Sequence, residues 1–201
     1  HPEQWQGTVY AKMEGTDIAA WRTWIDFPVG IKQGYGATQV WMDFARGDAQ
    51  KIVADVVLRD VVTPLGPKAP DTSLNTLSGR LSWQRLPDGQ ELQAEKIRLV
   101  SPGLNMHNGN ILVRNRSEKG KELSEGRIRL DEISLEQLAA FAEHISLGEQ
   151  LREALAAAQP KGILQQLELD WGSSAEKLER YGLRSRFSQL SMNPYHGIPG
   201  F

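Results

Sequence analysis

Alternation of apolar and polar residues over two consecutive long segments constrains the fold more than any other feature. Residues 36–45 alternate in this way, and the alternation resumes in residues 52–62 after a turn at Gly47 and Asp48. A period of two places every second side chain on the same face of a β-strand, and a short glycine-containing turn joins antiparallel neighbours. The two segments therefore predict a pair of long antiparallel strands.

The second of these segments is apolar on both faces. Ile52 and Val56 fall on one face, whereas Val53 and Val57 share the other with charged residues. A strand with one face in solvent alternates more cleanly than this. We therefore expect the second face to be covered, or to be able to accept a cover.

The same period recurs along the chain between clusters of turn residues. We expect further strands at residues 7–13, 74–83, 92–100, 104–114, 126–131, 165–172 and 180–192. A shift in the apolar phase predicts a β-bulge between Ala94 and Ile97. The phase of the last strand also slips near Ser188. Asn108-Gly109 fits either a bulge in one strand or a tight hairpin, and we favour the bulge.

Helical periodicity and capping residues predict three short helices. They follow Asp17, Ser134 and Ser146. The first is about two turns long, so its tryptophans must be buried on the sheet to hold it.

Together these elements predict an α+β fold that is predominantly antiparallel β. We expect a long curved β-meander of roughly nine strands, with about three short helices packed on one face. Residues 1–192 are expected to form a single β-rich domain and residues 193–201 a turn or linker. Because the sequence begins without methionine and stops soon after turn residues, we expect it to be a segment of a longer protein.

Charge and composition exclude several classes of function. The formal net charge of −2 offers no field that would hold nucleic acid, so no nucleic-acid partner is expected. The chain has no cysteine, and its four histidines lack metal-ligand spacing. We therefore expect no metal site and no cofactor. No run reaches the roughly 18 apolar residues that a membrane-spanning helix needs, so a membrane anchor is absent from this segment.

Catalytic patterns are also missing. Glu168 and Asp170 share a strand face and are the nearest approach to an acid–base pair, but a solvated, charged strand face explains them better. The basic residues between Arg114 and Lys121 are diluted by Glu118, which favours a solvated loop over a lipid-headgroup contact. We expect a protein that is not an enzyme.

Five segments carry a resemblance to a known family. They are AAWRTWIDFPVGIKQGYGATQVWMDF, IVADVVLRDV, SLNTLSGRLSW, GRIRLDEISLEQL and LELDWG. In the sequence and order of these segments, from about Trp21 to Trp171, the chain resembles the YhdP branch of the AsmA-like proteins. The resemblance implies an envelope protein of Gram-negative bacteria, anchored in the inner membrane by an N-terminal helix. Its long periplasmic part would be built from β-strands curled around an apolar groove, and would help carry phospholipid between the inner and outer membranes.

The resemblance implies phospholipid acyl chains and neighbouring segments of the same chain as the expected partners. One apolar face of the predicted strands would then line the groove. Its candidate residues are Val40, Met42, Leu77, Leu81, Leu167 and Leu169. Trp41, Val53 and Val57 represent the alternative face, and the pattern does not decide which face meets lipid.

Two other functions stay open. The first is a structural or interaction domain whose strand edges pair with neighbouring segments or with an envelope partner. The second, and less favoured, is an envelope enzyme such as a glycan hydrolase, which would require a cleft holding two close carboxylates.

Overall fold

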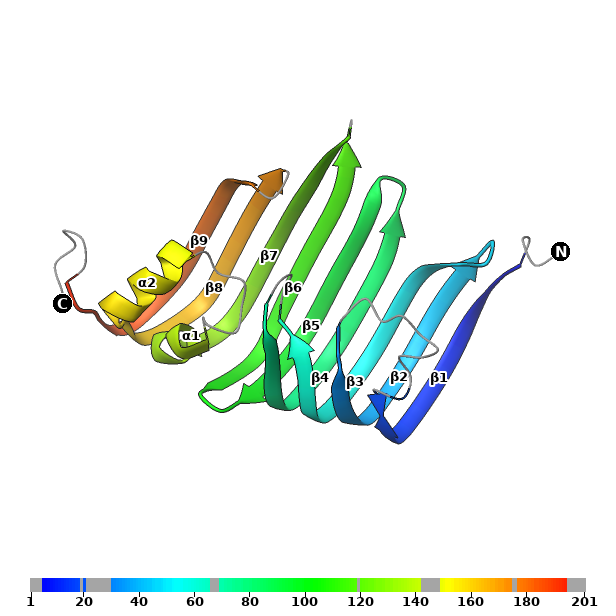
Figure 1. The fold of residues 1–201 in the computed structure, drawn as a ribbon, viewed down its shortest axis with the longest axis horizontal. Helices are drawn as coiled ribbons and strands as arrows, with labels where there is room; N and C mark the ends of the chain where they lie inside the picture. Colours follow the sequence, from blue (N-terminus) through cyan, green and yellow to red (C-terminus); the bar gives the residue numbers. More distant parts are fainter. Residues whose placement is uncertain are drawn as a thin grey trace.

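One antiparallel sheet dominates the structure, a computed structural model that describes residues 5–18, 20, 30–65, 69–118, 120–141, 149–174 and 177–194. Its nine strands lie side by side in chain order, as Figure 1 shows. They are β1 (Gln6–Asp17), β2 (Gln33–Ala45), β3 (Asp48–Pro64), β4 (Asp71–Leu86), β5 (Gly89–Ser101), β6 (Leu104–Glu118), β7 (Lys121–Ser134), β8 (Lys161–Ser174) and β9 (Lys177–Ser191). This arrangement confirms the predicted antiparallel meander.

Two helices are described, not about three. Helices α1 (Leu135–Phe141) and α2 (Glu149–Ala158) both fall between β7 and β8 in the chain. Thr16 and Asp17, the expected caps of the first helix, pair with β2 and so belong to β1, and Ile18 and Ala20 after them have 3₁₀ geometry. Most of that expected helix, residues 21–29, lies outside the described residues, as do residues 142–148 before α2.

Several strands are longer than their apolar pattern predicts. Strand β4 begins at Asp71, which pairs with Pro64 at the end of β3. The polar stretch expected to be a loop after Arg114 instead continues β6 and β7, and Glu118 pairs with Lys121 at the tip. Glu118 and Lys121 are exposed at the tip of β6 and β7, whereas Thr63 and Thr72 beside the Pro64–Asp71 pair are buried.

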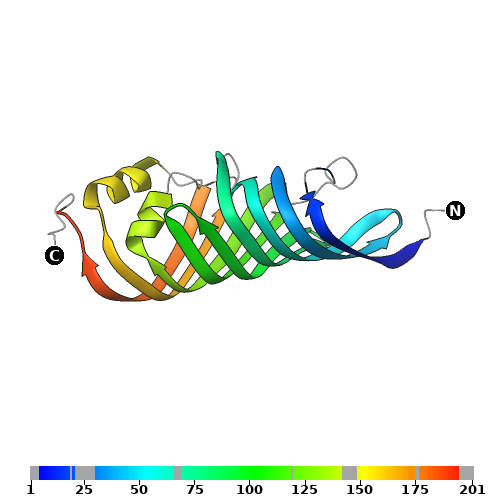
Figure 2. The same cartoon turned by 90° about the horizontal axis from the view of Figure 1, so that it is seen from below.

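The sheet bends across its strands. Residues other than glycine adopt a positive φ at bulges within β3, β5, β6 and β8, and these residues are Asp60, Lys96, Asn108 and Gln166. Bulges increase the local twist and bend a strand. We call the line through these four bulges, which passes across β4 and β7, the crease, and the sheet is a trough in Figure 2. The bulge predicted between Ala94 and Ile97 and the bulged form of β6 are both confirmed.

The hydrophobic core lies on the concave side of this crease. Leu58, Val61 and Leu74 are almost completely buried there. Phe141 of α1 covers the core from one end, and Ile18 and Ile31 belong to the same cluster at the other. Ser134 caps α1 by accepting the backbone N–H of Gln137 at 3.3 Å, as its capping spacing predicts. The core thus fills the bottom of the trough and leaves its longer wall uncovered.

Candidate functional site

Two rows of apolar side chains cross the whole longer wall of the trough. Residues paired across antiparallel strands point to the same face, so the strand register defines each row. The outer row, nearer the β4–β5 hairpin tip, consists of Val9, Met42, Ile52, Trp83, Leu92, Val113, Gly126, Trp171 and Tyr181. The inner row consists of Ala11, Val40, Ala54, Leu81, Ala94, Ile111, Ile128, Leu169 and Leu183. We call these two rows together the apolar band.

The apolar band lies on the concave face. Ala54, Leu81, Ala94 and Ile128 of the inner row pack against the core cluster, which α1 also contacts. Figure 2 shows α1 and α2 on the hollow side of the sheet. The band residues of strands β2 to β8 are half-buried, and the band becomes more exposed at the edges, where Leu183 is 62% exposed. The band is therefore a continuous apolar surface that the described residues leave open.

Glycine shapes the outer row at one position. A methyl group on Gly126 would lie 2.2 Å from an atom of the Trp171 ring, so the ring extends across Gly126 and fills its place in the row. Larger side chains at residue 126 would displace the indole. The outer row therefore remains apolar where it crosses β7, with the Trp171 ring in the place of a side chain at residue 126.

Nine strands about 4.8 Å apart make each row about 38 Å long. One bilayer leaflet contains roughly 15 Å of hydrocarbon. Each row is thus longer than the hydrocarbon layer of one leaflet is thick.

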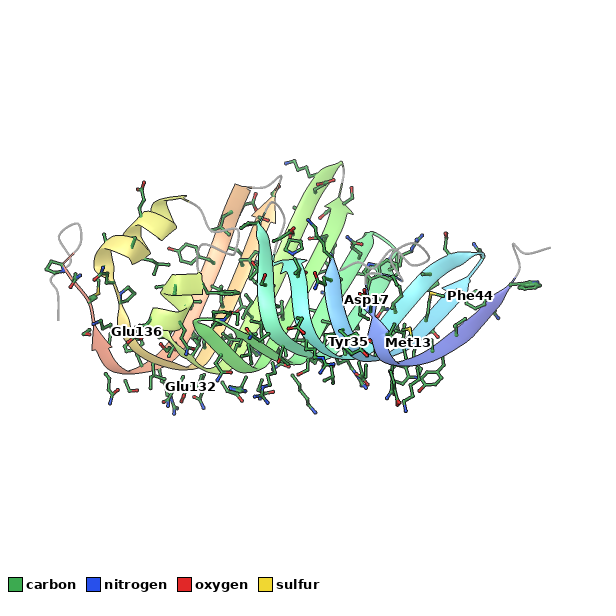
Figure 3. The ribbon with its side chains drawn as sticks, turned by 60° about the horizontal axis from the view of Figure 1, so that its bottom comes forward. Met13, Asp17, Tyr35, Phe44, Glu132 and Glu136 are labelled. Atoms are coloured by element: carbon green, nitrogen blue, oxygen red, sulfur yellow. The ribbon has the colours of Figure 1, made fainter. Side chains whose placement is uncertain are left out.

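Charged residues gather on the opposite, convex face. Residues one position away from the outer row form a convex row of Thr8, Asp43, Lys51, Gln84, Glu91, Arg114, Glu125, Gly172 and Arg180. In Figure 3, Glu132 projects from this side, whereas Glu136 lies at α1. Neither row of the apolar band contains an ionisable side chain other than the Tyr181 phenol. The sheet therefore separates charge from apolar surface by face.

Ion pairs link the charges of the convex face across neighbouring strands. Arg80 binds Asp55 with both Nε and Nη2 at 2.7 Å, and this bidentate contact lowers the pKa of the Asp55 carboxyl. Arg127 donates to Asp170 at 2.5 Å, and the hydrogen bond raises the pKa of Arg127. These ion pairs match part of the charge of the convex face across the strand register.

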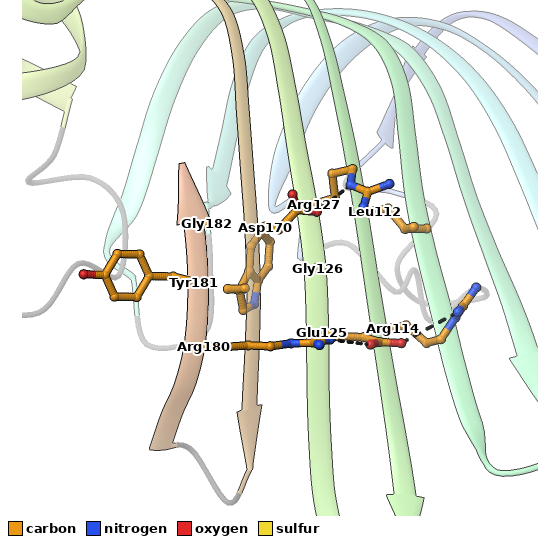
Figure 4. A pocket seen from close by; sticks show the side chains of 10 residues that line it. Leu112, Arg114, Glu125, Gly126, Arg127, Asp170, Arg180, Tyr181 and Gly182 are labelled. Atoms are coloured by element: carbon orange, nitrogen blue, oxygen red, sulfur yellow. Dashed lines mark hydrogen bonds and ion pairs between the residues drawn. The ribbon is translucent and has the colours of Figure 1, made fainter. Parts of the chain in front are cut away.

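A hollow of about 470 Å³ also lies among these charges. Figure 4 shows the side chains that line it, including Arg114, Glu125 and Arg180. Glu125 contacts Arg114 at 3.7 Å, Arg116 at 3.4 Å and Arg180 at 3.4 Å, and Arg114 also binds Glu91. Because its arginines already hold carboxylates, the hollow is not a ready anion site.

The structure brings the six sequence-based groove candidates onto one face. Val40 and Met42 of β2, Leu81 of β4 and Leu169 of β8 belong to the apolar band. Leu77 and Leu167 lie on the same face but deeper, where they are 7% and 8% exposed within the core. Whether any of them contacts lipid stays a prediction.

The three residues of the alternative face lie on the convex side. Trp41 packs beside Tyr10, with ring centroids 5.3 Å apart, and pairs with Val53 on the next strand. Val57 is 62% exposed, so the described residues do not supply the cover expected over this face. Its neighbours include charged Asp55 and Arg59, which interrupt the apolar surface.

The sequence patterns missed the middle of the band. Ile111 and Ile128 connect Ala94 with Leu169, yet neither was a groove candidate. Their alternation was visible in the sequence, but the bulges shift its phase, so only the strand register shows that they continue the row.

The carboxylates considered for acid–base chemistry are engaged in ion pairs. Glu168 accepts two hydrogen bonds from Arg129, and Asp170 accepts one from Arg127. No group of side chains within the described ranges has the composition of a metal site. None of the helices in the described part of the chain is long and apolar enough to cross a membrane.

Comparison with known proteins supports the same family as the sequence motifs. No curated protein and no solved structure matches the chain. Residues 2–201 match the family described as YhdP protein. Since this match spans nearly the whole sequence, the chain belongs to the YhdP family.

Proposed function

We propose that this chain is a periplasmic segment that helps to move phospholipid between the inner and outer membranes of a Gram-negative envelope. The observation that supports the proposal is the apolar band, which runs without a break across all nine strands on the concave face. Membership of the YhdP family is compatible with this role. In the full-length protein the segment would be held at the inner membrane by an anchor elsewhere in the chain.

The energetics favour a continuous apolar surface for such a role. Moving an acyl chain of about sixteen carbons from a bilayer into water costs on the order of 12 kcal/mol, at about 0.8 kcal/mol per methylene. A surface that remains apolar from β1 to β9 offsets this cost at every position along the path. A row without ionisable groups also presents no polar trap at which the acyl chain would stop.

A charge placed in the band tests the proposal. We expect the chain, purified from a Gram-negative host, to carry phospholipid that native mass spectrometry detects and extraction identifies. Leu81→Asp should abolish this lipid, because a carboxylate on the inner row must be desolvated when an acyl chain covers it. The matched control is Ser82→Asp, which places the same charge on the convex face of the same strand and should leave the lipid in place.

Circular dichroism must show that both variants keep the β-sheet. Lipid that survives Leu81→Asp, or that Ser82→Asp removes equally well, would contradict the assignment of the band as the lipid-contact surface. Met42→Asp provides a second position on the outer row should the Leu81 variant unfold.

An interaction domain is the second candidate, and the exposed edge strand β9 favours it. Tyr181, Leu183 and Phe187 of this strand are each more than 60% exposed. Among the described residues, β9 pairs only with β8, so its other edge is open to a neighbouring segment of the parent protein. A lipid-free chain that self-associates in sedimentation experiments would favour this function over lipid transport.

We also propose that the chain is not an enzyme. Glu168 and Asp170 are held by Arg129 and Arg127 on a solvated face, away from the concave surface. Their role is to link β7 with β8.

A further inference from the structure

A row of polar side chains, uncharged except for one arginine, borders the apolar band on its open side. Gln90, Asn115, Ser124 and Ser173 are paired in turn from β5 to β8, and Arg85 of β4 extends the row at one end. We call these five residues the rim row. Each lies two positions along its strand from a member of the outer apolar row, so the two rows share the concave face about 7 Å apart.

The rim row contains no carboxylate, and its one cation is paired. Arg85 contacts Asp48 at 3.5 Å, on the β2–β3 hairpin. The convex row one position away in sequence is ionic instead, with Glu91, Arg114 and Glu125. Closeness to the hairpin ends therefore does not explain why the rim row has no carboxylate and a single cation, because the same strands carry charged side chains on their other face.

Two members of the rim row have free hydrogen-bonding capacity. Asn115 and Ser124 are half-buried, and within the described ranges their side chains make no hydrogen bond. The Gln90 side chain contacts the outer apolar row, since its Oε1 accepts the indole N–H of Trp83 at 3.0 Å. Amides and hydroxyls thus meet indole and aliphatic groups along one line on the concave face.

The apolar band is two side chains wide along each strand. Its two rows lie about 7 Å apart, between the rim row and the buried core residues such as Leu130 and Leu167. Helix α1 closes the core side over β6 to β8 through its contacts with those strands. Over β6 to β8, the rim side is therefore the side of the band that α1 leaves open for a headgroup.

From this arrangement, and resting on the proposed function, we infer that the rim row is the subsite for the phospholipid headgroup. Its amides and hydroxyls would donate hydrogen bonds to the phosphate and ester oxygens while the acyl chains lie on the band. Uncharged donors recognise the phosphodiester that phospholipids share, and they neither attract nor repel a net charge. The rim row would consequently accept zwitterionic and anionic phospholipids alike.

Headgroup charge provides the test. The purified chain is incubated with vesicles of phosphatidylethanolamine or phosphatidylglycerol that carry the same acyl chains, and the lipid captured per chain is measured. We expect equal capture of the two lipids within about twofold. The variant Asn115→Asp/Ser124→Asp should lower capture of phosphatidylglycerol about fivefold relative to phosphatidylethanolamine, because two carboxylates would face its net negative charge.

Ser82→Asp/Gln93→Glu is the matched control, since it adds two carboxylates to paired positions on the convex face. It should leave the ratio of the two lipids unchanged. The single variant Asn115→Asp, which preserves the shape of the side chain, gives the same comparison if the double variant does not fold.

The outcomes separate the two proposals. A lipid ratio that stays the same in the rim variants, while Leu81→Asp still abolishes capture of both lipids, would overturn the headgroup subsite and leave the lipid-transport role intact. Absence of capture by the unmodified chain would overturn both. A strong preference of the unmodified chain for one headgroup would contradict the neutral subsite directly.

Discussion

Single residues on the two faces of the sheet are held by different forces. On the convex face, charged neighbours are linked across strands, as in the contact between Asp55 and Arg80. On the concave face, apolar side chains pack against one another and against the core cluster. Exposed ion pairs contribute little to folding stability, whereas burial of apolar surface contributes most of it. The concave face therefore stabilises the fold, and the convex pairs mainly match charges across the strand register.

The Asp55–Arg80 pair makes a prediction about acid stability. The bidentate contact lowers the pKa of Asp55 in the folded chain, so its contribution to stability is present above the ordinary aspartate value of about 3.9 and is lost as the pH falls through the folded-state pKa. Asp55→Asn should reduce the free energy of unfolding slightly at pH 7. The difference from the unmodified chain should shrink towards zero below pH 3.

Urea denaturation at a series of pH values measures this difference. Glu122→Gln is the control, because Glu122 is exposed and makes no ion pair among the described residues. A difference for Asp55→Asn that grew as the pH fell would have the wrong sign for this contact.

Residue-level alternation predicted the face of each groove candidate, because a strand has a fixed period of two. The alternation could not predict how deeply each of these side chains is buried. Leu77 and Leu81 have the same periodicity, yet Leu77 is in the core and Leu81 is in the band. The crease and the covering helix decide between them, and both depend on contacts distant in sequence.

At the level of elements, the strand bulges determine the shape of the sheet. Lys96 adopts a φ of 52° between Ala94 and Ile97, and the register of β5 with β6 shifts there. Its side chain is exposed, so the backbone conformation and not packing distinguishes this position. The bulges of β3, β6 and β8 share this backbone feature, since each has a residue other than glycine at positive φ.

Substitution of Lys96 tests whether the crease needs this conformation. Lys96→Val should destabilise the chain by about 1–2 kcal/mol relative to Lys96→Gly, because a β-branched residue is strained at positive φ and glycine is not. Arg98, an exposed residue of the same strand, should show the opposite order, since valine suits a regular strand better than glycine does. Thermal denaturation of the four variants gives the comparison.

The same order of valine and glycine at both positions would show that the bulge at Lys96 is not required. A loss of cooperativity in Lys96→Val would indicate instead that the crease organises the whole sheet.

Phase slips in the sequence indicated where bulges occur, but not their effect. The shift between Ala94 and Ile97 was apparent from β5 alone. The alignment of bulges from strand to strand becomes visible only through the register. Similarly, Ser134 indicated the start of α1, whereas its place on the concave face depends on contacts with β6, β7 and β8.

The whole molecule is a one-sheet trough whose hollow face is apolar along its length. The antiparallel meander was predictable because each strand carries its own turn and alternation signals. The end of β1 was not predictable, because Thr16 and Asp17 have capping chemistry but belong to β1, where a partner strand satisfies their backbone. The sequence could not predict that the apolar band is open, because this depends on where the other segments of the chain lie relative to the band.

Photo-crosslinking along the concave and convex faces tests the central claim most directly. A photoreactive amino acid is placed singly at Leu81, Ile111 or Leu169 of the inner row, or at the convex neighbours Ser82, Leu112 and Asp170, and the chain is irradiated in Gram-negative cells. We expect phospholipid adducts, detected by mass spectrometry, at the three concave positions and at none of the convex ones. Adducts on both faces, or on the convex face alone, would contradict the claim that the apolar band carries lipid.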